Sequence, residues 1–123
     1  MPVQFEIDKS KRLVMSTASY EVTFNDMKKH RDALLAHPDF NPEFDGVFHF
    51  TDTASLKMSS AEIREIAART GFSKTSRRAI VAPTDMLFGM SRMYETYYSM
   101  LEHPAQIHVF DNLEAALQWL GRK

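Results

Sequence analysis

The chain has 123 residues, of which 44% are hydrophobic and 25% are charged, the proportions of an ordinary globular protein. Fifteen basic and sixteen acidic residues leave a formal net charge of −1, which argues against a general nucleic-acid binder and gives no reason to expect attraction to an anionic membrane. The absence of cysteine excludes disulfides, thiol catalysis and cysteine-ligated zinc.

The start of the chain predicts a β-hairpin followed by a helix. Apolar and polar residues alternate along 3–7, residues 8–11 are polar enough to form a turn, and a second strand begins at 13–15. The alternation indicates that the first strand is an edge strand with one face in water. Thr23 is expected to cap a helix that ends before Pro38, because the residue before a proline avoids helical dihedral angles.

Strands and helices alternate along the rest of the chain. After a loop over 39–46, residues 47–50 form a short apolar run that is typical of a buried central strand. Ser59 begins a capping box for a second helix, and Gly71 is the expected C-cap of that helix.

The last third predicts two more strand–helix pairs. Residues 78–82 predict a buried strand, and Thr84 caps a third helix, in which methionine and tyrosine recur at helical spacing. Residues 106–110 predict the last strand, and a final helix opens at 111–114.

The order of elements is β-β-α-β-α-β-α-β-α. It implies an α/β fold with a mostly parallel five-stranded sheet, an N-terminal β-hairpin and four helices. Since the chain contains no repeat and no long linker, we expect residues 1–123 to form a single domain. Its charged, alternating start is not that of a signal peptide and no apolar run is long enough for a membrane span, so we expect a cytoplasmic protein.

The sequence contains no recognisable catalytic motif, and we assign no catalytic residue. The histidines have no paired metal-ligand spacing, so no metal site is predicted. His49 and His108 lie on predicted inner strands, where they form either a polar pair or two separately hydrogen-bonded histidines at a sheet–helix boundary. No glycine loop for phosphate is present, and close helix packing or ligand approach would explain Gly89 inside the third helix.

A hydroxyl-rich loop is expected directly after the strand at 47–50. In open α/β sheets the functional sites lie at the carboxyl ends of the strands, and a loop beside the positive end of a helix suits an anion or a phosphorylated side chain. Turn and cap chemistry, which favours the same residue types, is the alternative. The candidate residues are Asp52, Thr53, Ser55 and Ser59.

A second candidate surface combines the three cations of 74–78 with the third helix. The cations form either a solvated loop or a site for an anion or acidic partner. Methionine and tyrosine together suit an adaptable contact surface, although a stripe of this kind also forms helix core. The candidate residues of this ligand or partner surface are Arg77, Arg78, Met90, Arg92, Met93, Tyr94 and Tyr97.

Four stretches, which extend over nearly the whole chain, carry a resemblance to a known family. They are His37–Phe40, Arg78–Ala82, Gly89–Glu95 and Ala115–Gly121. With the order of elements, they resemble the SpoIIAA-like fold shared by the STAS domains of anti-sigma factor antagonists. More specifically, the chain is similar to small, mostly uncharacterised bacterial proteins grouped as STAS-like or CRAL-TRIO-like.

The resemblance implies a phosphorylation site. In phosphorylation-switched antagonists, the serine that accepts phosphate follows an aspartate in the loop after the third strand, in a D-S-[ST]-G-like context. The matching stretch here is Asp52–Ser55, in which Thr53 stands in the place of the serine and Ser55 in the place of the glycine.

We carry three functional hypotheses forward. The leading one is a non-enzymatic STAS-like regulatory or protein-interaction module, switched by phosphorylation and acting on another protein or as a homodimer. The second is a carrier that binds a small amphipathic or anionic molecule in a helix–sheet pocket, with Arg77 or Arg92 holding a carboxylate or phosphate. The third is an enzyme with His49 and His108 as acid and base. We expect no cofactor and no nucleic-acid partner.

Overall fold

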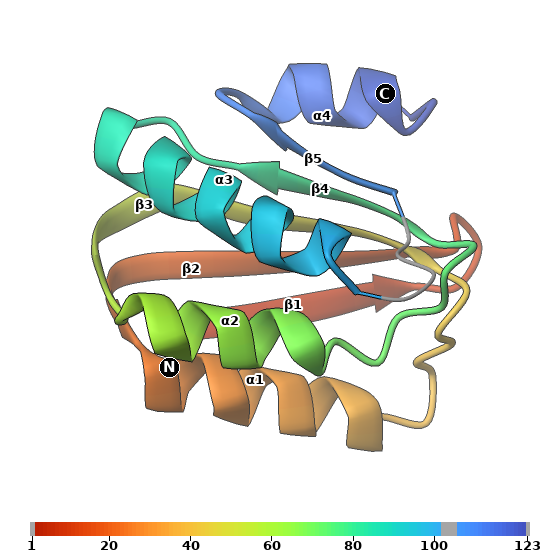
Figure 1. Cartoon of the computed structure of the whole chain (residues 1–123). Coiled ribbons are helices and arrows are strands. Elements are labelled where there is room, and N and C mark those ends of the chain that lie inside the picture. Colours follow the sequence, from red (N-terminus) through yellow and green to blue (C-terminus); the bar gives the residue numbers. More distant parts are fainter. Residues whose placement is uncertain (1, 102–105, 123) are drawn as a thin grey trace.

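The computed structural model describes residues 2–101 and 106–122, and these residues form one sheet with helices on both of its faces (Figure 1). The order of elements matches the prediction. In chain order they are β1 (Val3–Asp8), β2 (Leu13–Thr23), α1 (Phe24–Ala36), β3 (Asp45–Lys57), α2 (Ser60–Ala68), β4 (Arg77–Val81), α3 (Asp85–Ser99), β5 (Gln106–Phe110) and α4 (Leu113–Trp119).

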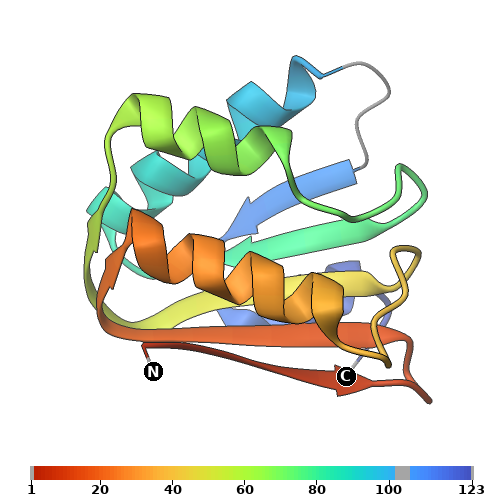
Figure 2. The same cartoon turned by 90° about the horizontal axis from the view of Figure 1, so that it is seen from below.

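The sheet has five strands in the order β1-β2-β3-β4-β5. β1 and β2 pair antiparallel as the predicted hairpin, while the pairs β2–β3, β3–β4 and β4–β5 are parallel. Helices α1, α2 and α3 cover one face of the sheet, and α4 lies alone on the other (Figures 1 and 2). The predicted mostly parallel five-stranded sheet with an N-terminal hairpin and four helices is therefore confirmed.

The helices begin where their capping residues predict. The Thr23 hydroxyl accepts the backbone N–H of Asp26, whose carboxylate in turn accepts the N–H of Thr23, and Ser59 forms the same reciprocal box with Glu62. Each box satisfies two backbone donors that the helix itself leaves unpaired. Thr84 caps α3, and Asn112 caps α4.

β3 is much longer than predicted, and the predicted hydroxyl-rich loop is wrong. The strand starts at Asp45, two residues before the expected start, and continues to Lys57. The reason is tertiary: β2 also runs on to Thr23, and its residues 17–23 pair with His49–Lys57 through two register shifts. Ladder hydrogen bonds to this long partner strand override the turn preference of the polar residues.

Two glycines differ from their predicted roles. Arg69, not Gly71, is the C-cap of α2. Gly71 has φ +76°, a backbone conformation that favours glycine, and a Cβ atom there would lie 2.2 Å from Leu35 Cδ2, so the Leu35 side chain would have to move. Gly89 is exposed and a Cβ atom there would meet nothing within 4 Å, so close helix packing does not explain it.

The core has a main layer on each side of the sheet. On the side of α1–α3, the fully buried Leu87 packs with Phe50 and Ile80 in one cluster. On the other side, Ala116 and Leu120 near the end of the chain pack against strand residues of β2, β3 and β4. The strands are therefore buried on both faces around β3 and β4, as the apolar runs predict.

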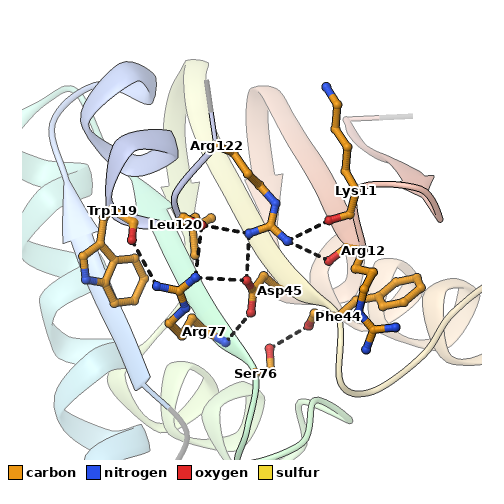
Figure 3. A network of polar contacts seen from close by, with 9 residues as sticks. All are labelled: Lys11, Arg12, Phe44, Asp45, Ser76, Arg77, Trp119, Leu120 and Arg122. Carbon is orange, nitrogen blue, oxygen red and sulfur yellow. Dashed lines mark hydrogen bonds and ion pairs between the residues drawn. The ribbon is translucent and has the colours of Figure 1, made fainter.

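A polar network at the amino ends of β3 and β4 joins the chain's C-terminal end to the sheet (Figure 3). The carboxylate of Asp45 accepts the backbone N–H of Arg77 at 2.8 Å and the Nη1–H of Arg122 at 2.8 Å. Arg77 in turn donates to the carbonyls of Trp119 at 3.2 Å and Leu120 at 3.0 Å, and these carbonyls lie at the end of α4. We call Asp45, Arg77 and Arg122 the Asp45 cluster. It fixes α4 on its face of the sheet.

Replacement of Asp45 tests how strongly this cluster stabilises the fold. Asp45→Ala leaves two half-buried guanidinium groups without their carboxylate, and we expect a loss of about 2–4 kcal/mol in the free energy of unfolding. The control is Asp39→Ala, which removes an exposed ion pair with Lys9 and is expected to cost less than about 1 kcal/mol. Urea denaturation of both variants measures the difference, and equal losses would contradict the role given to the Asp45 cluster.

Candidate functional site

Two adjacent arginines on β4 lie on opposite faces of the sheet. Successive side chains of a strand point to opposite faces, so Arg77 shares its face with Ala79 and α4. Arg78 shares the other face with Ile80, under α1–α3. Arg77 is part of the Asp45 cluster, whereas the side chain of Arg78 lies in a different environment.

That environment is a cavity of about 120 Å³ between the sheet and the helices α1, α2 and α3. Most of its wall is apolar, with contributions from all three helices and from β2 and β3. Apolar lining residues include Val14, Met27, Phe48, Ile63, Ile66 and Met90. Polar side chains also contribute to this wall, namely Ser16, His30, Arg31, Arg69, Thr70, Arg78, Ser91 and Tyr94. A mostly apolar wall with a few polar groups is the ordinary make-up of a small-molecule site.

The Arg78 guanidinium is surrounded by aromatic rings. Its carbon lies 4.7 Å from the ring centre of Tyr98, 5.1 Å from that of Phe72 and 5.7 Å from that of Tyr94. Nη1 donates to the Tyr94 hydroxyl at 3.1 Å. Nε and Nη2 are buried and have no hydrogen-bond partner among the described residues. Ring faces attract a cation, but they leave these two donors unsatisfied.

A second polar group in the cavity wall is the pair Ser16 and His30. The Ser16 hydroxyl lies 2.8 Å from His30 Nε2, and the imidazole stands edge-on to Phe5 and Phe48. Burial lowers the pKa of His30 from 6.5 to about 4, so the ring is neutral at pH 7. The pair is a neutral hydrogen-bonding point in the wall.

The structure brings together only part of the predicted ligand or partner surface. Arg78, Met90 and Tyr94 line the cavity. The other four predicted residues do not line the cavity. Arg77 belongs to the Asp45 cluster, and Arg92 is exposed and pairs with Glu95 at 2.9 Å. Met93 is 36% exposed, and Tyr97 packs at the edge of the core against Arg64. Arg78 therefore takes the position expected for Arg77 or Arg92.

The predicted polar pair of His49 and His108 does not form. The two residues lie on β3 and β5, which β4 separates. His49 lies between the hydroxyls of Thr17 and Thr51, at 2.9 Å and 3.2 Å, and burial lowers its pKa while the charge of Asp52 opposes that shift. His108 instead stands edge-on to Trp119. His108 Nδ1 also lies 3.8 Å from Glu95 Oε2, so each histidine has its own neighbours.

The residues predicted to bind an anion after β3 lie within a strand or cap a helix. Thr53 is buried in β3 and its hydroxyl has no partner among the described residues, while Asp52 is exposed and Ser55 half-buried on the same strand. The Ser59 hydroxyl accepts the Glu62 N–H as the cap of α2. Phosphorylation here stays a prediction, and a kinase would reach the buried Thr53 hydroxyl only after β3 opened locally.

Sequence reasoning did not assign Ser16, His30 or Phe72 to a site. A weak signal existed for His30, since it recurs with Met27 and Leu34 on one helical face and all three line the cavity. Nothing local singles out Ser16 or Phe72, because their roles depend on partners from distant elements.

The described residues contain neither a metal-binding cluster nor a helix that could cross a membrane. No group of three or more histidine, aspartate or glutamate side chains within 2–101 and 106–122 could hold a metal ion. Over the same ranges, none of the helices combines the length and the apolar character that crossing a membrane requires.

Comparison with known proteins supports the fold. The chain is similar to the crystal structure of an uncharacterised protein of the DUF3478 family with a SpoIIAA-like fold, from Shewanella loihica PV-4. The TM-score is 0.61 at 17% sequence identity, and the likeness covers 96% of this chain and 93% of that one. The SpoIIAA-like fold implied by the sequence resemblance is thereby confirmed. No family model and no curated protein matches the sequence.

The lowered pKa of His30 predicts how stability depends on pH. Between about pH 6.5 and pH 4 the unfolded chain binds a proton at His30 and the folded chain does not, so the free energy of unfolding falls as the pH falls through this window. The full shift corresponds to at most about 3 kcal/mol. Urea denaturation from pH 7 to pH 4 should show a shallower fall for His30→Gln than for the unmodified chain. Parallel curves for the two proteins would contradict a buried, neutral His30.

Proposed function

We propose that this protein binds a small apolar or amphipathic molecule in the cavity between the sheet and α1–α3, as a carrier or ligand-sensing domain. The observation that carries the proposal is the cavity itself, with an apolar wall and a few polar groups from separate elements. The cavity is partly open to solvent, and most of its accessible wall is apolar. A concave, mostly apolar surface with a few polar groups is the usual make-up of a small-molecule site, and the apolar part of a ligand would cover this wall.

The size of the cavity limits the ligand. An engineered apolar cavity of about 150 Å³ is known to bind benzene, so a void of 120 Å³ suits a group close to a benzene ring or a short alkyl chain. A long-chain lipid would need further opening between the helices. The lining extends to the surface at the exposed Arg69, which marks a route for exchange with solvent.

A second candidate, a regulatory module acting by protein contact, is favoured by one surface feature. α3 and the residue after it expose three methionines: Met86 is 45% exposed, Met93 36% and Met100 76%. Exposed methionine suits adaptable protein contacts. This candidate places function on the outer face of α3, whereas the cavity lies beneath that helix.

Two substitutions on α3 test the cavity proposal. Met90 lines the cavity and Met93 does not, although both lie on the same helix. Met90→Trp adds side-chain volume that occupies the void, whereas Met93→Trp adds it at the surface. Binding of fluorobenzene, a neutral probe close to benzene in size, can be followed by ¹⁹F NMR. We expect binding to the unmodified chain and to Met93→Trp, and at least tenfold weaker binding to Met90→Trp.

Thermal unfolding of both variants controls for a loss of fold. Absence of fluorobenzene binding to the unmodified chain, or equal binding by the two folded variants, would contradict the proposal. The same variants also distinguish the second candidate function. If the outer face of α3 binds a partner protein, Met93→Trp should weaken that binding and Met90→Trp should leave it unchanged.

A further inference from the structure

One edge of the Arg78 guanidinium has no acceptor. Of its three nitrogens, Nη1 bonds to the Tyr94 hydroxyl, and Nε and Nη2 remain without a partner although both are buried. In a planar guanidinium, the N–H of Nε and one N–H of Nη2 point in parallel from the same edge. That pair of donors matches the two oxygens of a carboxylate and forms the bidentate contact typical of arginine.

The charge of the cavity wall points to the same class of ligand. Three arginines, Arg31, Arg69 and Arg78, line the cavity, and no aspartate or glutamate is among its described lining residues. Arg31 has a carboxylate beside it, since its Nε lies 3.3 Å from Asp32 Oδ1. Arg78 has no carboxylate within ion-pair distance among the residues described. Arg78 itself is half-buried, but its Nε and Nη2 are covered by protein atoms, and covered donors without an acceptor are costly.

Gly46 and Tyr94 help to position the Phe72 ring and the Arg78 head group. A Cβ atom on Gly46 would lie 3.2 Å from Phe72 Cζ and 3.7 Å from Arg78 Cγ, so the absence of a side chain there lets the ring and the arginine stem pack closely over β3. The Tyr94 hydroxyl then orients the guanidinium through Nη1. These contacts orient the guanidinium but leave its Nε and Nη2 donors without an acceptor.

We propose that the cavity ligand is a small monocarboxylate whose carboxylate pairs with Nε and Nη2 of Arg78 and whose apolar part fills the space beside Met90. This inference rests on the proposed function, and it adds the class of ligand and the anchoring residue. In the ligand-free structure protein atoms cover both nitrogens, so binding includes a small movement of the flexible Arg78 side chain toward the ligand. The neutral His30 and Ser16 provide further hydrogen-bonding groups in the wall.

Calorimetric titration of the full chain at pH 7 with four probes, each with a straight chain of six carbons, tests this inference. The probes are hexanoate, hexan-1-ol, hexylamine and hexyl phosphate, and benzoate distinguishes an aromatic from an aliphatic carboxylate. We expect hexanoate or benzoate to bind at least tenfold more tightly than the alcohol, because a charge-assisted bidentate contact adds to the same apolar contact. We expect the amine to bind most weakly.

Three variants assign the effect to Arg78. Arg78→Met keeps an apolar side chain of similar length, so it should bind hexanoate no better than hexan-1-ol. Arg78→Lys keeps the charge without the paired donors and should lose at least fivefold in hexanoate affinity. Arg92→Met removes an exposed arginine that does not line the cavity and should bind as the unmodified chain does.

Each remaining outcome counts against a specific claim. Equal affinity for hexanoate and hexan-1-ol, or a preference for hexanoate that persists in Arg78→Met, would overturn the carboxylate assignment while leaving a ligand cavity in place. Tighter binding of hexyl phosphate than of both carboxylates would overturn the carboxylate class. If Arg78→Met does not fold, two results still test the carboxylate assignment: the affinities of the four probes for the unmodified chain, and the affinity of Arg78→Lys for hexanoate. Failure of every probe while fluorobenzene still binds would overturn this inference alone, whereas failure of fluorobenzene to bind contradicts the proposed function itself.

Discussion

Strand alternation on β4 separates two arginines that adjoin in sequence, and the architecture of the site depends on that separation. On one face, Arg77 meets Asp45 and the carbonyls at the end of α4, and this contact closes the smaller core layer. On the other face, Arg78 lies under α3 with aromatic rings around it. None of the described carboxylates forms an ion pair with it. One strand thus supplies a structural arginine to one layer and an unsatisfied arginine to the other.

The cavity follows from the way three helices cover one face of the sheet. α1, α2 and α3 contribute Met27, Ile63 and Met90 to one wall, while β2 and β3 supply the floor. Loop residue Phe72 adds a ring against Arg78, and Gly46 provides the space for it. Apolar groups from separate elements converge here around Arg78, whose Nε and Nη2 have no partner among the described residues, and a ligand carboxylate would supply one. The SpoIIAA-like fold supplies the scaffold, but function has to be argued from this site.

The sequence predicts those parts of the structure that depend on local chemistry. Thr23, Ser59 and Thr84 cap their helices as expected, because a cap bonds to backbone only three residues away. The extension of β3 to Lys57 depends on pairing with residues 32–34 positions earlier, which no local preference reveals. The site shows the same division. Arg78, Met90 and Tyr94 are among the predicted residues, but β4 is apolar toward both faces, so its pattern does not tell which arginine enters the cavity. His30 and Ser16 meet across two elements and gave no joint signal.

A crystal structure of the chain grown with hexanoate is the most direct measurement of the central claim. The account predicts the carboxylate oxygens about 3 Å from Nε and Nη2 of Arg78, with the alkyl chain in the cavity beside Met90 and the Arg77–Asp45 contact unchanged. Hexanoate bound at the surface, or in the cavity with its carboxylate directed away from Arg78, would contradict it.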